Sequence, residues 1–600
     1  MLIPDETEFF KNFPVSGKND WLKLLEKENG ETPSGENLKL HCFDQLSINI
    51  LQDAAGSLKF NLPEKNTGRW KVRTDIDFNN FNSGIENLLK FRDGTDVFGI
   101  AVSGGELLKW DLSDVRNLIA AIPAGREICF DCSHNFDHLF SLICGGAMLN
   151  ELKGKTVYGA FDFPGDLLLS EPSSDGKNIF MMYAEAIRAA EKKEMSIMPV
   201  RIGAGFFRRA GASAVQELVF SLSLGTEFLL GLKNAGIDPS TAVKYIYFQF
   251  ESGSDFYLET AKYRSFRILW KKVLKEFGCE ESEVKIHALP SGYEVTLYEK
   301  YSNIIRIAVQ SLSSVIGGAD IVSAALPYSG NDSVFSDFNY SPRDLLLILK
   351  HESGIYDITD PVEGSYSMSE MIHELTDRAF NLFKDAEQKG GFIRAYEEGW
   401  IQSEIEKSFI AGKLDFFSQK KKIAGLNCYV DHGNVLENQK VMNEFSETEK
   451  NPGAGRLAEE MEILRYHSDI YAKKMNVRPV IAVCFDPEKN TLSLDKIKNI
   501  IHASGCSFET FKIAERQDCR KFVLKNSAAA LFFPSLSCAG EFDPSYFSGM
   551  KLPLFGADQA LAQYSEDFNL FSFDDYKNVT DYYRIMLNRL KGMADGSAGK

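Results

Sequence analysis

Four side chains of the metal-binding type lie close together in the first quarter of the chain. They are Cys129, Cys132, His134 and His138. A CxxC pair followed by two histidines has the composition of a zinc site. However, only Ser133 separates Cys132 from His134, and the residues from Arg126 onward alternate like a strand, so the pairs would point to different faces. The spacing favours structural cysteines, and we expect no metal site here.

Three carboxylates, Asp360, Glu363 and Glu370, could serve as a general acid and base. Pro361 and Gly364 lie among them. Proline fixes φ and glycine permits a positive φ, so together they lock a tight turn. We interpret the carboxylates as part of a structural turn.

Two glycine pairs, Gly317–Gly318 and Gly390–Gly391, could cradle a phosphate with their backbone N–H groups. Each pair also stands at the end of a helical pattern, where glycine caps a helix by adopting positive φ. Helix capping is the interpretation that we adopt.

The elements that must position these residues alternate between short apolar strands and longer helices. From Val97 to about Gly412 this alternation is typical of a barrel of parallel strands. The strand candidates are Ile128–Cys132, Val157–Phe163, Ile197–Ile202, Ile246–Glu251, Val284–Leu289 and Ile321–Leu326. The sequence predicts an α/β fold whose larger part is a (β/α)8 TIM-type barrel.

The chain resumes the same alternation near its end, which predicts a smaller flavodoxin-like, doubly wound domain. The segment before that domain is rich in charge, Gly and Asn, and is typical of a surface linker. Near the start, Asp20–Glu28 predicts an amphipathic helix within an N-terminal arm. The predicted division is an arm at 1–40, a barrel domain at 41–417, a linker at 418–477 and the flavodoxin-like domain at 478–600.

Composition narrows the class of protein. The chain has 600 residues, 44% of them hydrophobic and 25% charged, which suits globular domains, and no apolar run approaches the length of a membrane helix. The net charge of -17 argues against a nucleic-acid partner and against a membrane. Ten cysteines at irregular spacing and an acidic N-terminus indicate a reducing, cytoplasmic location without a targeting peptide.

Four segments together resemble one enzyme family. Tyr356–Phe392 is similar to its DPxxGSYxxExLT segment, and Ser254–Gly278 to its DFFxExAKxRAxRxLW helix. Tyr301–Gly318 matches YNNxxRxxxxAxxAVxGG, and Arg209–Leu218 matches AGAxxxxEL. These segments resemble those of the adenosylcobalamin-dependent acyl-CoA mutases, of which methylmalonyl-CoA mutase is the best-known member.

Where the resemblance would place the substrate, this chain departs from the family. The family's TIRQYAGF segment sets a Tyr against the substrate, whereas Val72–Phe78 has Asp75 there. Its GYHMQEAGA segment supplies a Tyr and a His, whereas Gly205–Ala212 has Phe206 and Phe207. A phenyl ring offers no hydrogen bond to a thioester carbonyl. The family's QNDILKEYxxR stretch, whose Arg pairs with the substrate carboxylate, has no counterpart, and we expect no catalytic residue on this chain.

The cofactor motif is also missing. The family binds cobalamin with DxHxxG after the first strand of a C-terminal domain, where the His is the lower cobalt ligand. Here Asp486 and Pro487 follow the strand Pro479–Phe485, and no His comes after them. His502 precedes Ala-Ser-Gly in an HxxG spacing, but the apolar pattern places it on a helix. We expect no cofactor-binding or metal-binding residue in this cobalamin-type domain.

Two further segments also depart from the family's cofactor-binding motifs. Ser535–Leu536 keeps part of the family's SxL contact, with Pro534 in place of its first Ser, and no Gly-Gly loop follows Leu554. The sequence Asp431-His432-Gly433 is no displaced ligand, because no strand directly precedes it, and we expect a solvated turn.

The resemblance implies a fold that has lost its recognisable sites. Such a chain is similar to the small, non-catalytic subunit of heterodimeric methylmalonyl-CoA mutase, a pseudoenzyme. The large subunit would bind adenosylcobalamin and interconvert (R)-methylmalonyl-CoA and succinyl-CoA, and the arm would wrap that partner. Homologous chains keep a self-complementary interface, so one member of the pair can lose its site. The alternatives are a divergent but competent acyl-CoA mutase, and an acyl-CoA-binding or scaffold protein.

Overall fold

A computed structural model gives the arrangement of the chain. It describes residues 17–29, 39–41, 46–49, 69–133, 155–162, 177–192, 196–203, 205–279, 282–324, 342–436, 456–485, 491–512, 518–519, 521–522, 530–533, 554–556, 568–570 and 576–595.

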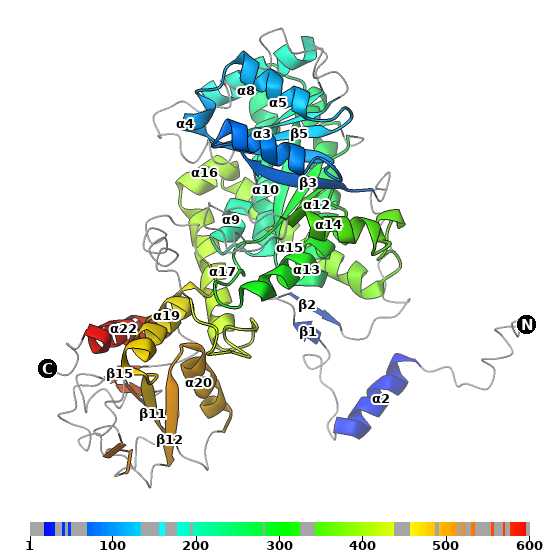
Figure 1. The fold of residues 1–600 in the computed structure, drawn as a ribbon. Coiled ribbons are helices and arrows are strands. Elements are labelled where there is room, and N and C mark those ends of the chain that lie inside the picture. The colour runs from blue at the N-terminus through cyan, green and yellow to red at the C-terminus, as the bar shows by residue number, and fades with distance from the viewer. Residues whose placement is uncertain are drawn as a thin grey trace, which may run out of the picture.

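Eight parallel strands close into a barrel in the larger part of the molecule (Figure 1). They are β3 (Lys71–Asp77), β4 (Val97–Ser103), β5 (Glu127–Ser133), β6 (Val157–Asp162), β7 (Ile197–Gly203), β8 (Ile246–Ser252), β9 (Ile286–Pro290) and β10 (Ile321–Ser323). The barrel closes where Ile321 of β10 pairs with Lys71 of β3. The predicted (β/α)8 barrel is therefore confirmed, and β3 and β4 join the six strand candidates.

Most helices of this part lie outside the barrel, and the last of them, at Trp400–Phe417, runs from the barrel towards the smaller part (Figure 1). They are α3 (Phe81–Lys90), α4 (Gly104–Leu107), α5 (Leu112–Ala121), α8 (Lys177–Lys192), α9 (Gly205–Arg209), α10 (Ala214–Asn234), α11 (Pro239–Ala242), α12 (Phe256–Glu276), α13 (Lys300–Gly317), α14 (Pro342–His351), α15 (Tyr366–Gln388), α16 (Gly391–Glu397) and α17 (Trp400–Phe417), with 3-10 turns at Val243–Tyr245 and Ile355–Asp357. Alternate strand residues such as Phe248 and Phe250 point outward and are fully buried against these helices.

One described helix, α10, is long and apolar enough to cross a membrane, but 78% of its apolar window is buried inside the protein. Ser213 caps its N-terminus in a capping box with Gln216, which fixes where the helix begins. It packs between β7, α12 and α15, so burial in the barrel's outer layer accounts for its apolar character.

The smaller part contains a five-stranded parallel sheet in the order β12-β11-β13-β14-β15. Its elements are β11 (Val480–Phe485), α20 (Thr491–Ala503), β12 (Ser507–Lys512), β13 (Ala530–Phe533), β14 (Leu554–Gly556), β15 (Phe568–Leu570) and α22 (Tyr576–Asp595). Helix α20 packs against β12, and α22 packs against α19 (Glu459–Met475).

Helix α19 lies within the predicted surface linker 418–477, and there the structure differs from that prediction. Glu462, Arg465 and Asp469 of α19 are buried. The linker was predicted because the segment is rich in charged residues, which usually lie in solvent. Leu457, Met461 and Leu464 join barrel-side residues in one hydrophobic core. Charged residues tolerate burial here because each has a partner.

The N-terminal region contains α2 (Lys18–Asn29), which confirms the predicted helix, and a hairpin of β1 (Lys39–His41) and β2 (Ser47–Asn49). In Figure 1, α2 lies away from both larger parts. Leu46 and Ile48 are buried in the barrel's core, so the hairpin is anchored to the barrel.

Candidate functional site

A charged network fills the inside of the barrel at the level where β3, β5 and β7 face one another. Arg73 of β3 donates to Asp75 Oδ1 at 2.7 Å and is paired with Asp131 of β5. Arg201 of β7 donates to Asp131 Oδ1 at 2.5 Å, and Ser323 of β10 donates to Asp75. Two guanidinium groups and two carboxylates therefore neutralise one another across the barrel.

Gly99 of β4 makes room for this network. A Cβ at Gly99 would overlap Asp75 Oδ1 and lie 2.7 Å from Arg73 Nε. The Arg73 side chain is only 4% exposed, whereas those of Asp75 and Asp131 are 22% and 26% exposed. The network therefore closes the barrel at Arg73, and its carboxylates face the mouth.

Two uncharged side chains, Cys129 and His287, also contact Arg73 inside the barrel. Arg73 also donates to Cys129 Sγ at 3.1 Å and lies 3.3 Å from His287 Nδ1. Burial and the neighbouring Arg73 hold the pKa of His287 well below its usual range, so its ring is neutral. Burial raises the pKa of the Cys129 thiol to about 11. Neither group is an activated base or nucleophile at neutral pH.

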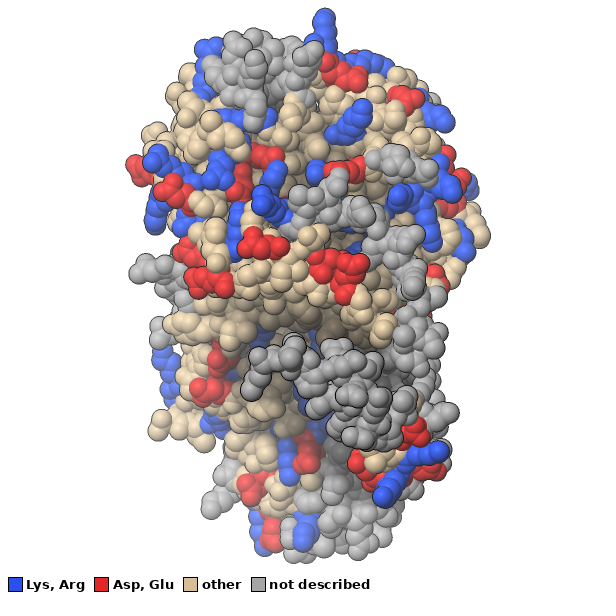
Figure 2. Space-filling view, turned by 90° about the vertical axis from the view of Figure 1, so that its right-hand side faces the viewer, with Lys and Arg blue, Asp and Glu red and all other residues tan. Residues whose placement is uncertain are grey.

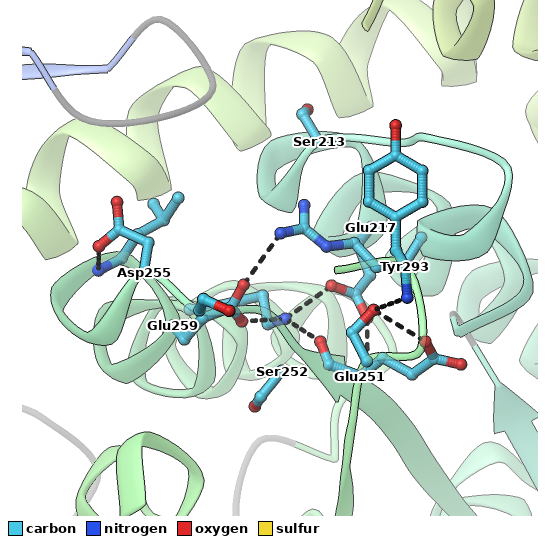
Figure 3. A network of polar contacts seen from close by, with 12 residues as sticks. Ser213, Glu217, Glu251, Ser252, Asp255, Glu259 and Tyr293 are labelled. Carbon is cyan, nitrogen blue, oxygen red and sulfur yellow. Dashed lines mark hydrogen bonds and ion pairs between the residues drawn. The ribbon is translucent and has the colours of Figure 1, made fainter. Parts of the chain in front are cut away.

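A second charged cluster lies beyond the C-terminal end of β8, where barrel enzymes place their sites. Figure 3 shows three carboxyl side chains of this cluster, Glu217, Glu251 and Glu259, close to one another. Lys262 of α12 donates to Glu217 Oε2 at 2.7 Å and to the backbone oxygen of Glu251 at 2.6 Å, and its Nζ forms an ion pair with Glu259 Oε2 at 2.5 Å. The side chains of Lys262, Glu217 and Glu259 are all fully buried.

The carboxyl groups in and beside this cluster have pKa values that are shifted in opposite directions. Desolvation raises the pKa of Glu251 to about 7, although Arg209 at 3.0 Å opposes the shift. Desolvation also raises the pKa of Glu217. The pKa of Glu294 falls to about 2, because the paired Lys421 outweighs its burial. A carboxyl with a pKa near 7 at the end of a barrel strand could exchange a proton, but Gly205 and Arg209 enclose it.

The residues of the family motifs serve mainly as partners in such pairs. Glu217 comes from the AGAxxxxEL match, and Glu259 and Lys262 come from the DFFxExAK match. Arg264 is paired with Asp360 of the DPxxGSY match, and Arg267 Nη2 lies 2.9 Å from Asp320 Oδ2.

The carboxylates proposed as part of a turn fit that interpretation. The Asp360 pair with Arg264 ties the turn to α12, and Gly364 has φ +83°. Glu363 and Glu370 lie in the same turn and in the first turns of α15.

The glycine pairs end helices, as predicted. Gly318 caps α13 with φ +94°. Gly390 and Gly391 have φ +97° and +87° between α15 and α16. The backbone N–H groups of Phe392 and Ile393 donate to the carboxylate of Glu227, so a side chain of the protein already supplies the anion at this pair. The sequence did not reveal Glu227 as the partner of this glycine pair.

Phe207, which replaces the family's His, lies in the apolar core and not in the barrel mouth. It is 1% exposed and packs against Phe220 and Phe392 at ring-centroid distances of 5.1 and 5.8 Å. The backbone of Phe206 lies in α9. A ring in this position can only contribute packing.

The metal-type residues do not form a site within the described part of the chain. Cys129 points into the barrel, and the side chain of Cys132 as well as His134 and His138 lie outside the described residues. The described residues contain no group of three or more His, Cys, Asp or Glu side chains arranged to hold a metal ion.

The two histidines discussed as cobalt ligands lie against each other. His502 lies on α20, as predicted, and its ring stacks on His432 at 4.1 Å. His432 lies in a turn, but it is half-buried, and its Nε2 is 2.9 Å from the backbone oxygen of His502. Burial and the nearby Arg478 lower the pKa of His432 to about 4.

Neither histidine lies where the family's DxHxxG loop would follow β11: Arg478, just before that strand, donates to the backbone oxygens of His432 and Gly505, so the pair lies near the start of β11, and His432 Nε2 already faces the backbone oxygen of His502. The remaining residues named for the cofactor, Asp486, Pro487 and Pro534 to Leu536, lie outside the described part of the chain.

Fold and clusters together define a (β/α)8-barrel protein joined to a second α/β sheet. The profile of the family described as methylmalonyl-CoA mutase matches residues 175–469. The methylmalonyl-CoA mutase small subunit of Porphyromonas gingivalis is 30% identical over 451 residues, which cover 71% of this chain and 72% of that protein. The chain belongs to the methylmalonyl-CoA mutase family.

Other relatives differ in how much they share. The methylmalonyl-CoA mutase small subunit of Streptomyces virginiae is 27% identical over 512 residues, 80% of this chain and 81% of that protein. The methylmalonyl-CoA mutase of Rhizobium meliloti is 29% identical over 257 residues, 41% of this chain and only 35% of that protein. The two small subunits thus match along most of their length.

Proposed function

We propose that this chain is the non-catalytic small subunit of a heterodimeric methylmalonyl-CoA mutase. Its larger homologous partner binds adenosylcobalamin and interconverts (R)-methylmalonyl-CoA and succinyl-CoA in the cytoplasm. The proposal rests on the small-subunit names of two relatives that match most of the chain. It includes an N-terminal arm, the barrel and a flavodoxin-like domain, and the strand order of the second sheet supports the last of these.

One observation carries the non-catalytic part of the proposal: the Arg73–Asp75–Asp131–Arg201 network occupies the barrel interior. Asp75 stands where the resemblance places the substrate-facing Tyr, and it is held by Arg73 and Ser323. An acyl chain that passed this level would have to displace Arg73, which is 4% exposed and paired with both carboxylates.

The lost His supports the same conclusion. Phe207 in the core can neither donate a proton nor hydrogen-bond to a thioester oxygen. The half-buried His432–His502 stack likewise supports binding of the cofactor by the partner alone.

The test is reconstitution with the larger mutase chain of the same organism. We expect this chain alone to retain no cobalamin absorbance after gel filtration and to show no mutase turnover, and the two chains together to elute as a one-to-one active complex. Cobalamin retained by this chain alone, with turnover, would support the divergent-mutase alternative. A large chain that is fully stable and active alone, and that does not bind this one, would defeat the proposal.

A further inference from the structure

Gln249 of β8 and His287 of β9 are neighbours inside the barrel. They are paired in the parallel register of the two strands, so their Cα atoms lie about 4.8 Å apart. His287 points inward, because its Nδ1 lies 3.3 Å from Arg73 Nη1 in the charged network of the barrel. Gln249 points inward as well, since Phe248 and Phe250 on either side of it pack in the outer core. The two side chains therefore share one region of the barrel interior.

Each of these side chains has one buried polar atom that finds no hydrogen-bond partner in the described part of the chain. The two atoms are Gln249 Oε1 and His287 Nε2. His287 as a whole is 2% exposed. On the outside of the molecule, solvent satisfies polar groups, and Figure 2 shows Lys, Arg, Asp and Glu spread over that surface. Inside the barrel, a polar atom without a partner destabilises the fold.

The two atoms have complementary hydrogen-bonding roles. The guanidinium of Arg73 can only donate, so His287 Nδ1 accepts from it. Burial and Arg73 keep the pKa of His287 low and its ring neutral, and the single ring proton is therefore on Nε2. Gln249 Oε1 is an amide oxygen and can only accept. A group that accepts from Nε2–H and donates to Oε1 would satisfy both atoms.

Gly203 of β7 lies on the other side of Gln249. It is the register partner of Gln249, and it follows the inward-pointing Arg201 by two residues, so it takes an inward position. A glycine contributes no side chain to the barrel interior. One side chain is therefore missing beside Gln249, and a water molecule needs only about 30 Å³.

We infer that a single water molecule is bound between Gln249 and His287 as part of the barrel interior. It accepts from His287 Nε2–H and donates to Gln249 Oε1, which gives it the two polar partners that a buried water requires. A cation could not accept from Nε2–H, an anion without a proton could not donate to Oε1, and an apolar molecule would leave both atoms unpaired. This site is independent of the proposed function.

The direct test is a crystal structure of the full-length chain at a resolution that shows ordered water. We expect one peak, of the size of a single atom, within about 3.2 Å of both Gln249 Oε1 and His287 Nε2. A direct hydrogen bond between the two side chains, or the lack of any peak, would overturn the inference. So would a larger molecule in this place, which native mass spectrometry of the purified chain would detect as an added mass that is released on unfolding.

Two variants that share the same Cβ test the site in solution. Gly203→Ala and Gly203→Ser both displace the water, but only the serine hydroxyl can replace it by donating to Gln249 and accepting from His287. We expect the equilibrium constant for unfolding in urea to be about tenfold larger for Gly203→Ala than for Gly203→Ser. Any clash of the added Cβ is common to both variants and cancels in this comparison. Equal stability, or a more stable alanine variant, would mean that the two atoms share no water.

Discussion

Lys262 illustrates what a retained motif residue does in this chain. Its amino group is fully buried between Glu217 and Glu259. The attraction of these partners holds its pKa above the usual range, although burial alone would lower it. The lysine is therefore charged, and its loss would leave two carboxylates buried together.

We expect Lys262→Met to lower the free energy of unfolding by about 3–5 kcal/mol, because removing one partner of a buried pair leaves uncompensated charge. Urea denaturation at neutral pH measures the change. Lys271→Met, on an exposed position of the same helix, is the control and should change stability by less than about 0.5 kcal/mol. Equal stability of both variants would show that the cluster has no structural role.

The lowered pKa of His432 predicts that the free energy of unfolding decreases as the pH falls. Its pKa is about 4 in the folded chain, below the usual 6.5, so the unfolded chain takes up a proton first as pH falls. Its contribution to stability is therefore present above pH 6.5 and is lost between pH 6.5 and 4. Relative to wild type, His432→Gln should show a flatter fall in stability over this range in chemical denaturation. The same flattening in His351→Gln, an exposed histidine of α14, would argue against this cause.

At the scale of elements, the sequence predicts where the strands lie but not which contacts their inward side chains make. The six strand candidates and the helix at 20–28 are confirmed because period-two and helical patterns are local. The hairpin of β1 and β2 was not foreseen, since its strands have only three residues each.

The candidate site was predicted only in part. Comparison with the family motifs identified Asp75 and Phe207 as replacements of a Tyr and a His. It did not predict which residues surround Asp75 and Phe207. Arg73, Asp131 and Arg201 come from strands far apart in sequence, and only the closed barrel brings them together. The available signal was a charged residue at an inward position of an otherwise apolar strand.

The close approach of Asp75 and Arg73 of β3 to Gly99 of β4 predicts that a methyl group added at Gly99 lowers stability. Gly99→Ala should lower stability by about 1–3 kcal/mol, because the new Cβ overlaps Asp75 and Arg73 and forces them to move. Thermal unfolding measures it. Gly105→Ala is the matched control, since nothing lies within 4 Å of a Cβ there. An unchanged melting temperature for Gly99→Ala would mean that the barrel interior is loosely packed.

At the scale of the whole molecule, the barrel and the second sheet share one core. Tyr293 and Tyr298, in the loop after β9, pack with α17, α19 and α22. Tyr298 donates to Asp469 at 2.8 Å, and Leu297 N donates to Glu462 at 2.7 Å. Arg465 also stacks on the Tyr298 ring at 3.8 Å. These contacts couple the stability of the two parts.

We therefore expect the two parts to unfold in one transition. All five tryptophans lie at or before Trp400, so their fluorescence reports on the barrel and arm side, while hydrogen exchange of α20 and α22 reports on the second sheet. The two midpoints should coincide in wild type. Tyr298→Phe, which leaves Asp469 without this donor, should separate them or lower both. Distinct midpoints in wild type would contradict the coupling.

The closing pair of the barrel also bears on how the chain is synthesised. Lys71 of β3 pairs with Ile321 of β10, 321 − 71 = 250 residues later. At about 5–20 residues per second, a ribosome needs roughly 12–50 s to add them. During that interval the β10 side of β3 is an open strand edge with unpaired backbone groups, which other nascent chains can join. Translation speed and chaperone supply should therefore govern the soluble yield of this protein.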